Sequence, residues 1–112
     1  MIDPASGKIV PRGTTGELCI RGYGVMLGYW EDELATSSAI DAAGWLHTGD
    51  LAIMDDEGYV GIVGPIDDVI VRGSEKIHPR EVEEFLHSLP GIDDVQVIGV
   101  PSATYGEAVM AW

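Results

Sequence analysis

The stretch that decides the fold is Gly64–Phe85, which reads GPIDDVIVRGSEKIHPREVEEF. An apolar strand pattern at Tyr59–Val63 stops at its Gly-Pro pair, and a second apolar run, Val69–Val71, begins after two acids. A stop, a Gly-Pro turn and a restart are typical of a joint between two bodies. An ordinary tight connection inside one small domain has the same local pattern, and local physics alone favours that interpretation.

The segment after this joint predicts a small α+β unit. We expect two short strands around a turn at Gly73-Ser74, then a helix, then two further strands. These elements are Val69–Arg72, Glu75–Ile77, Pro79–His87, Asp94–Val100 and Glu107–Trp112. Pro79 suits the first helical position, and Glu81 can complete a capping box. The apolar stripe of this helix, at i, i+3, i+4 and i+7, consists of Val82, Phe85, Leu86 and Leu89.

The segment before the joint predicts mainly antiparallel β structure with one short helix. Polar and apolar residues alternate in Glu17–Arg21, and Asp32–Ile40 has acids in its first turn, as a helix does. Trp45–Met54 predicts two strand pieces around Thr48-Gly49-Asp50, and Asp55–Gly58 predicts a hairpin turn. The glycines of Gly22–Trp30 do not fit a dinucleotide-binding fingerprint.

Composition limits the class of protein. Acidic residues outnumber basic ones 19 to 6 in 112 residues, and the net charge of −13 argues against partners such as nucleic acid or an anionic membrane surface. No apolar run predicts a transmembrane segment, and the N-terminus has no signal-sequence pattern. We therefore expect a cytoplasmic protein. The abrupt start at Met1 and the strand pattern that ends at Trp112 predict a fragment of a longer chain.

Few residues predict chemistry on their own. A carboxylate after a glycine at a strand break, as at Asp50, can accept from both hydroxyls of a ribose, but an aspartate that satisfies its own turn is the commoner case. Asp67 and Asp68 would point to opposite faces of a strand. No metal site is expected, because His47, His78 and His87 have no ligand spacing among themselves and no cysteine partner at metal spacing. Cys19, the single cysteine, is expected to be a buried core thiol.

The motifs GELCIRGYGVMLGYW at Gly16–Trp30, GWLHTGDLA at Gly44–Ala52, the Gly64–Glu84 stretch and VQVIGVPSATYGE at Val95–Glu107 occur together in one order. In this the chain resembles the adenylate-forming (AMP-binding) superfamily. GWLHTGD with SEKIHPREVEEFL resembles its acyl-CoA synthetase branch, and GYGVMLGYW resembles the medium- or long-chain fatty acyl ligases. The resemblance implies a parent enzyme that joins a carboxylic acid to ATP, releases pyrophosphate, and passes the acyl group to CoA.

The resemblance also implies a domain plan. Residues 1–64 would end the large AMP-binding domain as a β subdomain, residues 65–68 would be the hinge, and residues 69–112 would be part of a small, truncated α+β C-terminal domain. The fold class is then α+β. The N-terminal domain missing from this chain would be its intramolecular partner.

Residue roles follow from the same resemblance. Asp50 matches the aspartate that binds the ATP ribose, and Asp67 matches the hinge residue. Gly73, with Ser74 and Glu75, matches the loop that closes on the pantetheine arm of CoA. ATP or AMP and CoA would be substrates, and Mg²⁺ is implied only by ATP chemistry. No catalytic residue is expected in this chain, because the family's lysine would lie beyond Trp112.

One departure from the family pattern leaves a second function open. The family usually has an arginine that contacts the nucleotide where this chain has Pro65, and proline brings neither charge nor N–H. The chain alone is not expected to catalyse either step. The alternative is a non-catalytic remnant or interaction module derived from the family.

Overall fold

Two sheets organise the computed structural model, which describes residues 1–112. The chain divides into two compact units, Met1–Ile62 (unit 1) and Val63–Trp112 (unit 2). The three-stranded sheet has the order β1-β2-β3, and the four-stranded sheet has the order β5-β4-β7-β6. None of the helices has the length and apolar character needed to cross a membrane.

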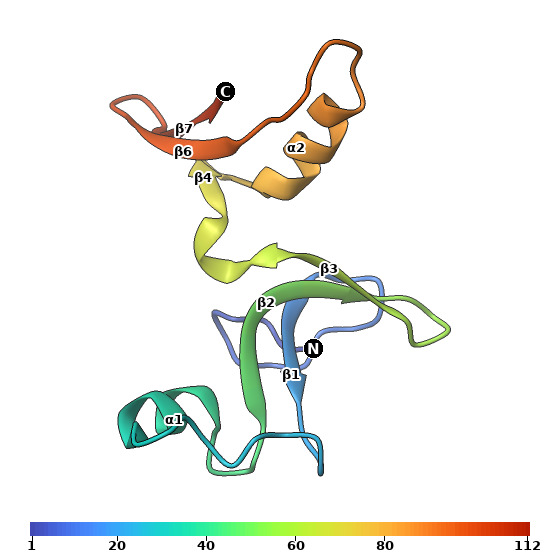
Figure 1. Ribbon diagram of the computed structural model, residues 1–112, viewed down its shortest axis with the longest axis vertical. Helices are drawn as coiled ribbons and strands as arrows, with labels where there is room; N and C mark the ends of the chain where they lie inside the picture. The colour runs from blue at the N-terminus through green and yellow to red at the C-terminus, as the bar shows by residue number, and fades with distance from the viewer. The chain divides into compact units, whose positions relative to one another are not determined.

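Unit 1 is built on an antiparallel pair of strands, β1 (Gly16–Ile20) and β2 (Leu46–Met54), which lie side by side in Figure 1. The prediction of two strand pieces at Trp45–Met54 is wrong, because β2 is continuous and absorbs Thr48-Gly49-Asp50 as an irregularity in its pairing with β1. The third strand, β3 (Val60–Pro65), runs two residues further than expected.

The connections of unit 1 follow their turn chemistry. Helix α1 (Glu33–Ala39) is capped by Asp32, whose Oδ1 accepts from the backbone N of Ala35 at 2.9 Å. The turn between β2 and β3 is closed by Asp55, whose Oδ1 accepts from the backbone N of Glu57 and of Tyr59. Leu51 and Ala52 are the buried apolar residues of this unit.

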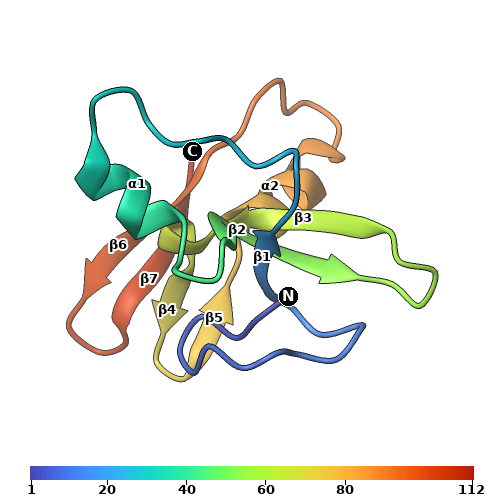
Figure 2. The ribbon, with the colours of Figure 1, turned by 90° about the horizontal axis from the view of Figure 1, so that it is seen from below.

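Unit 2 is the α+β arrangement that the sequence predicts. Strands β4 (Ile70–Arg72) and β5 (Glu75–Ile77) form a hairpin, and β6 (Val97–Ser102) and β7 (Gly106–Ala111) form a second one. Figure 2 shows the four strands in their order β5-β4-β7-β6, with α2 (Pro79–His87) beside them. A 3₁₀ turn, Ile66–Asp68, precedes β4, so Asp67 and Asp68 do not lie in a strand.

Helix α2 has the predicted bounds, but two details of the prediction are wrong. Phe85 is 66% exposed, although it was expected on the packed stripe with Val82 and Leu86. The N-cap His78 makes no side-chain capping bond, and Glu81 contributes only its backbone N–H, which donates to the His78 carbonyl at 3.2 Å. A partly buried Glu83 packs instead, and its Oε1 accepts from the backbone N of Val97 at 2.9 Å.

Mainly antiparallel sheets with two α-helices confirm the α+β class. Few side chains are fully excluded from solvent: the apolar core consists of Leu51, Ala52, Ile70 and Val97. A small core means that hydrogen bonds and turn geometry determine much of the local structure of each unit.

Candidate functional site

A bulge in β2 is the feature that positions Asp50. Glu17 pairs with Leu51 and Cys19 pairs with His47, so the three residues Thr48 to Asp50 face a single residue of β1. Gly49 has a φ of +74°, a backbone conformation that residues other than glycine adopt only with strain. The Thr-Gly-Asp sequence is therefore a bulge with a structural reason for its glycine.

Side chains from both strands hold this bulge in place. The Thr48 hydroxyl donates to the Leu18 carbonyl at 2.8 Å and accepts from the backbone N of Asp50 at 3.2 Å. The backbone N of Gly49 donates to Oε1 of Glu17 at 3.3 Å. The N–H groups of Gly49 and Asp50 in the irregular segment therefore both have a side-chain acceptor.

The Asp50 side chain is half-buried, and its carboxylate makes no hydrogen bond or ion pair within the chain. The commoner alternative, an aspartate that caps its own turn, is therefore not what the structure shows, since the Thr48 hydroxyl accepts from the local backbone N–H instead. A carboxylate on a fixed backbone with both oxygens unpartnered can accept from two hydroxyls of a ligand.

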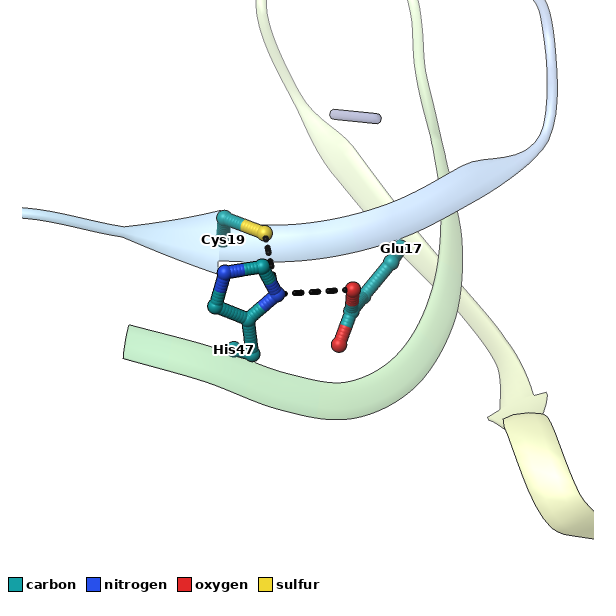
Figure 3. A group of neighbouring side chains, drawn as sticks. All are labelled: Glu17, Cys19 and His47. Carbon is teal, nitrogen blue, oxygen red and sulfur yellow. Dashed lines mark hydrogen bonds and ion pairs between the residues drawn. The ribbon is translucent and has the colours of Figure 1, made fainter. Parts of the chain in front are cut away.

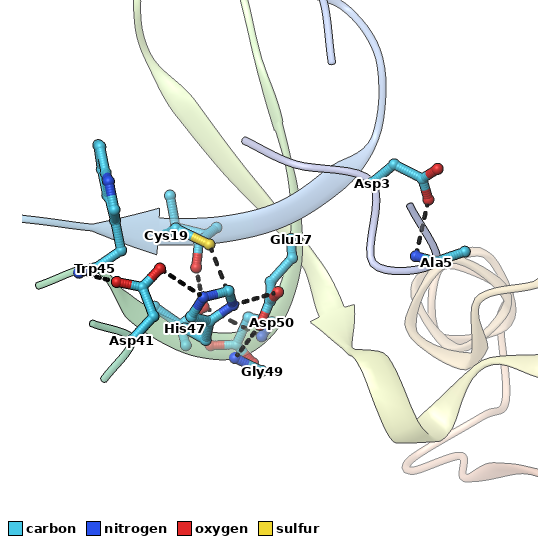
Figure 4. A network of polar contacts seen from close by, with 11 residues as sticks. Asp3, Ala5, Glu17, Cys19, Asp41, Trp45, His47, Gly49 and Asp50 are labelled. Carbon is cyan, nitrogen blue, oxygen red and sulfur yellow. Dashed lines mark hydrogen bonds and ion pairs between the residues drawn. The ribbon is translucent and has the colours of Figure 1, made fainter. Parts of the chain in front are cut away.

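Behind the bulge lies a chain of charged groups, shown in Figures 3 and 4. Oε2 of Glu17, a residue that is 7% exposed, accepts from Nδ1 of His47 at 3.0 Å. Oδ2 of Asp41 lies 3.5 Å from Nε2 of the same ring. The hydrogen bond with Glu17 is the main cause that raises the pKa of His47, and burial opposes it.

Asp41 also fixes the turn that leads into β2. Its Oδ1 accepts from the backbone N of Ala43 and of Trp45, both at 2.9 Å, and these bonds, chiefly the one to Trp45, lower its pKa. Trp45 in turn packs under Arg21, whose Cζ lies 4.8 Å from the ring centroid. The turn that leads into β2 is thus held by the hydrogen bonds to Asp41 and by the contact between Arg21 and Trp45.

Cys19 and His47 are neighbours in the fold, although their spacing in the sequence is not that of a metal motif. Sγ of Cys19 lies 3.7 Å from Nδ1 of His47, and the thiol is only partly buried. Burial, with Glu17 nearby, raises the pKa of this thiol. Sequence spacing missed the pair because the residues lie 28 positions apart. The signal was the pairing of two strands, with residues 17 and 19 on one face of β1.

The predicted hinge residues are at the surface. Pro65 is exposed at the end of β3 with φ −59° and ψ 145°, and Asp67 and Asp68 are exposed in the following 3₁₀ turn. No hydrogen bond or ion pair involves either aspartate side chain. The structure assigns these residues no ligand contact, so the hinge role of Asp67 stays a prediction.

The predicted CoA loop is the β4–β5 hairpin turn. Gly73 has a φ of +62°, and its backbone N donates to the Tyr105 carbonyl at 2.8 Å. Cζ of Arg72 lies 4.0 Å from the centroid of the Tyr105 ring. Ser74 and Glu75 are exposed. Tyr105, from the turn before β7, is a supporting residue that sequence reasoning missed.

Comparisons with known proteins identify the class of enzymes to which this chain is similar. No family model matches the chain. Solved structures do: ATP-bound MatB from Rhodopseudomonas palustris superposes with a TM-score of 0.90 at 39% identity, over 98% of this chain and 22% of MatB. MenE from Bacillus subtilis with its acyl-adenylate intermediate has a TM-score of 0.88 at 33% identity, over 95% of this chain and 22% of MenE. By fold and sequence, the chain is a homologue of the adenylate-forming enzymes.

Curated relatives narrow the class to one branch. YngI of Bacillus subtilis (strain 168), named as an acyl-CoA synthetase, is 53% identical over all of this chain and 20% of its own length. ACSF2 of Danio rerio, a mitochondrial medium-chain acyl-CoA ligase, is 50% identical over 99% of this chain and 18% of its own length. Over its whole length the chain is homologous to acyl-CoA synthetases and ligases. It spans about a fifth of the length of these relatives.

Proposed function

We propose that this chain is the segment of an ATP-dependent acyl-CoA synthetase that joins the end of the large AMP-binding domain to the mobile C-terminal domain. Residues 1–64 belong to the first, residues 65–68 form the hinge, and residues 69–112 belong to the second. The complete enzyme converts a carboxylate and ATP to an acyl-adenylate and pyrophosphate, then forms a thioester with CoA. The observation that carries this proposal is the match of the whole chain to acyl-CoA ligases at up to 53% identity.

Asp50 is the nucleotide-binding residue of the segment. Its half-buried carboxylate is free of internal partners, and the bonds of Thr48 and Glu17 to the bulge fix the backbone on which it stands. Accepting from the 2′- and 3′-hydroxyls of the ribose would use both carboxylate oxygens. The ATP-bound state of the structural neighbour MatB supports this choice of ligand.

The β4–β5 hairpin turn is the CoA loop. Gly73, Ser74 and Glu75 are exposed, and a glycine at the first turn position lets the backbone approach a thin pantetheine arm closely. Rotation about Asp67 would bring this loop to the acyl-adenylate after ATP has reacted. Asp67 suits a pivot because its side chain makes no bond that a rotation would break.

The acyl substrate is a medium-chain or long-chain fatty acid, and Mg²⁺ accompanies ATP. Support for the chain length comes from the medium-chain ligase ACSF2, which is 50% identical to this chain. Support for the ion comes from MenE, which has been crystallised with ATP and a magnesium ion and is 33% identical to this chain.

The test is a segment exchange. Residues 1–112 replace the matching segment of Danio rerio ACSF2, and the chimera is assayed separately for ATP–pyrophosphate exchange and for CoA thioester formation. We expect both half-reactions to be retained. We expect Asp50→Ala to raise the KM for ATP at least tenfold, about 1.4 kcal/mol of binding, and Asp56→Ala, an exposed acid of the same unit, to leave it unchanged.

The two half-reactions separate the roles of the residues. Gly73→Ala is expected to reduce thioester formation while pyrophosphate exchange persists. Gly91→Ala is the matched control, because Gly91 also has a positive φ of 85° but lies outside the loop. If Gly73→Ala lost pyrophosphate exchange while Gly91→Ala retained it, the assignment of the loop to CoA would be contradicted.

The alternative, a non-catalytic module, is favoured by Pro65 alone. A folded chimera that is inactive with Pro65 and active with Pro65→Arg would support it. The chain by itself is expected to show no pyrophosphate exchange above background, and exchange by the isolated 112 residues would contradict the segment assignment.

A further inference from the structure

Three donor atoms of different chemistry converge beside the bulge: a carboxylate oxygen of Glu17, Sγ of Cys19 and Nδ1 of His47 (Figure 3). All three lie within 4.8 Å of one another. They come from two adjacent strands that are hydrogen-bonded in register, with Glu17 and Cys19 on the same face of β1 and His47 opposite Cys19 on β2. The positions of the donors are therefore set by a sheet and not by a flexible loop.

Two of the three separations are close to those of ligands around one small ion. Nδ1 of His47 lies 3.0 Å from Oε2 of Glu17 and 3.7 Å from Sγ of Cys19. Tetrahedral zinc, with bonds of about 2.0–2.3 Å to N, O and S, separates its ligands by about 3.3–3.8 Å. All three donor atoms lie within 4.8 Å of one another, so a rotation of the longest side chain, Glu17, would bring its oxygen into the coordination sphere.

Asp41 contacts the ring nitrogen of His47 that is not a proposed ligand, as a carboxylate commonly does for a metal-binding histidine. Its Oδ2 lies 3.5 Å from Nε2 of His47, the ring nitrogen that faces away from the other donors (Figure 4). A carboxylate at this place fixes the ring and makes Nδ1 available as a ligand. The backbone bonds from Ala43 and Trp45 hold Asp41 there.

An ion can reach Cys19 and His47, two of the three donors, from solvent. The His47 side chain is 31% exposed, and a cavity of about 390 Å³ is lined by Cys19, Asp41 and His47 together with residues near the N-terminus. A water molecule in this cavity can occupy the fourth coordination position. Three protein ligands and one open position form an accessible site and not a closed one.

We propose that Glu17, Cys19 and His47 bind a divalent transition-metal ion, with Zn²⁺ as the ion that best fits one carboxylate, one thiolate and one imidazole. On binding, the Cys19 thiol and Nδ1 of His47 each release a proton to solvent, and the thiolate and the neutral imidazole nitrogen form the bonds to the ion. The Glu17 to Gly49 bond through the other carboxylate oxygen stays in place. The ion therefore binds next to the bulge without replacing its support.

The test is titration of the metal-free protein with Co²⁺, followed by displacement with Zn²⁺. Cys19 is the only cysteine in the 112 residues, so a thiolate-to-cobalt charge-transfer band reports on Cys19 alone. We expect one equivalent of Co²⁺ to produce the band and one equivalent of Zn²⁺ to remove it. Zn²⁺ should also slow the alkylation of Cys19 by iodoacetamide, a measurement that needs no variant.

Variants separate a site from unspecific binding. Cys19→Ser and His47→Gln should abolish the band and weaken Zn²⁺ binding more than Asp41→Asn does. Asp41→Asn keeps an oxygen for the Ala43 and Trp45 backbone bonds and should weaken Zn²⁺ binding by roughly 10–100-fold. His87→Gln, in the exposed last turn of α2, is the matched control and should change nothing.

Two results would overturn the proposal. One is the absence of a thiolate band together with unprotected Cys19 in the presence of Zn²⁺. The other is a Zn²⁺ affinity that is the same in His47→Gln as in His87→Gln, since binding would then not involve the cluster.

Discussion

Two glycine-centred turns, one in each unit, are stabilised in different ways. The β2 bulge has Gly49 at φ +74° and is held by side chains, those of Thr48 and Glu17. The β4–β5 turn has Gly73 at φ +62° and is held by a backbone bond to Tyr105 and the stacking of Arg72. The first presents a fixed carboxylate, and the second presents an exposed loop.

The difference extends to what stabilises each unit. In unit 1 a buried charge, Glu17 at 7% exposure, joins the bulge to His47. In unit 2 the buried residues are apolar, Ile70 at 2% exposure and Val97 at 4%. The β4–β5 turn connects two strands of the sheet to which these residues belong. The bulge that carries Asp50 and the exposed β4–β5 turn are thus stabilised by different interactions, and five predictions test that contrast.

The largest effect is expected in the apolar core of unit 2. Ile70→Ala removes the most fully buried large side chain and should lower the free energy of unfolding by about 2–5 kcal/mol. Hydrogen exchange of the β4 and β6 amides is the measurement. Val71→Ala, at a neighbouring residue that is 45% exposed, should cost much less. Equal costs would mean that unit 2 has no dominant apolar core.

The second effect concerns the buried carboxylate of unit 1. Glu17→Ala leaves the backbone N of Gly49 and the ring of His47 without their acceptor and should cost about 1–3 kcal/mol. Chemical denaturation followed by tryptophan fluorescence measures it. Glu57→Ala, an exposed acid in the β2–β3 turn, is the control and should be nearly neutral.

The same carboxylate gives the stability of unit 1 a pH dependence in the presence of a chelator. The pKa of His47 is raised in the folded chain, chiefly by Glu17. The protonated ring therefore stabilises the fold fully below its unfolded pKa of about 6.5, and this contribution is lost as pH rises through the higher folded pKa. In Glu17→Gln, an NMR titration should give a lower His47 pKa; an unchanged value would contradict the assigned cause.

A smaller effect is expected at the hydroxyl that bridges the bulge. Thr48→Val keeps the shape of the side chain but removes the bonds to Leu18 and Asp50, and should cost about 1 kcal/mol. Thermal unfolding measures it, with Thr14→Val at an exposed position as control. A cost no larger than that of Thr14→Val would show that Gly49 alone determines the bulge.

The smallest effect is expected at the aromatic contact of the second turn. Arg72→Leu removes the stacking on Tyr105 and should cost about 0.5–1 kcal/mol. Arg80→Ala, which removes only an exposed ion pair with Glu84 one helical turn away, should cost about 0.3–0.5 kcal/mol. Faster hydrogen exchange at Gly73 in Arg72→Leu, and not in Arg80→Ala, would confirm that the stacking steadies the turn.

Local signals sufficed where one residue type dictates the backbone. The bounds of α2 followed from Pro79 at its start and Pro90-Gly91 after its end, and the β4–β5 turn followed from Gly73-Ser74. These are short-range effects, in which proline removes a donor and glycine permits a positive φ. The acids at the start of Asp32–Ile40 indicated helix α1, but Asp32, expected in its first turn, is its N-cap.

Features that depend on strand register could not be predicted in this way. A bulge that sets Thr48, Gly49 and Asp50 opposite one residue is a property of two strands, as is the contact between Cys19 and His47. Phe85 fits the helical stripe by spacing and is still 66% exposed, while Val82, Glu83 and Leu86 are the partly buried side chains of this part of the helix. The geometry of the candidate site therefore came only from the structure, whereas the sequence motifs already indicated the enzyme family.

The most direct test of the account is whether Asp50 binds the ribose of ATP. In the ACSF2 chimera, KM is measured for ATP and for 2′-deoxy-ATP, with Asp50 and with Asp50→Ala. We predict that the intact chimera discriminates against the deoxynucleotide and that Asp50→Ala removes this discrimination, while Asp56→Ala retains it. Full discrimination in Asp50→Ala would contradict the assignment of this carboxylate to the nucleotide.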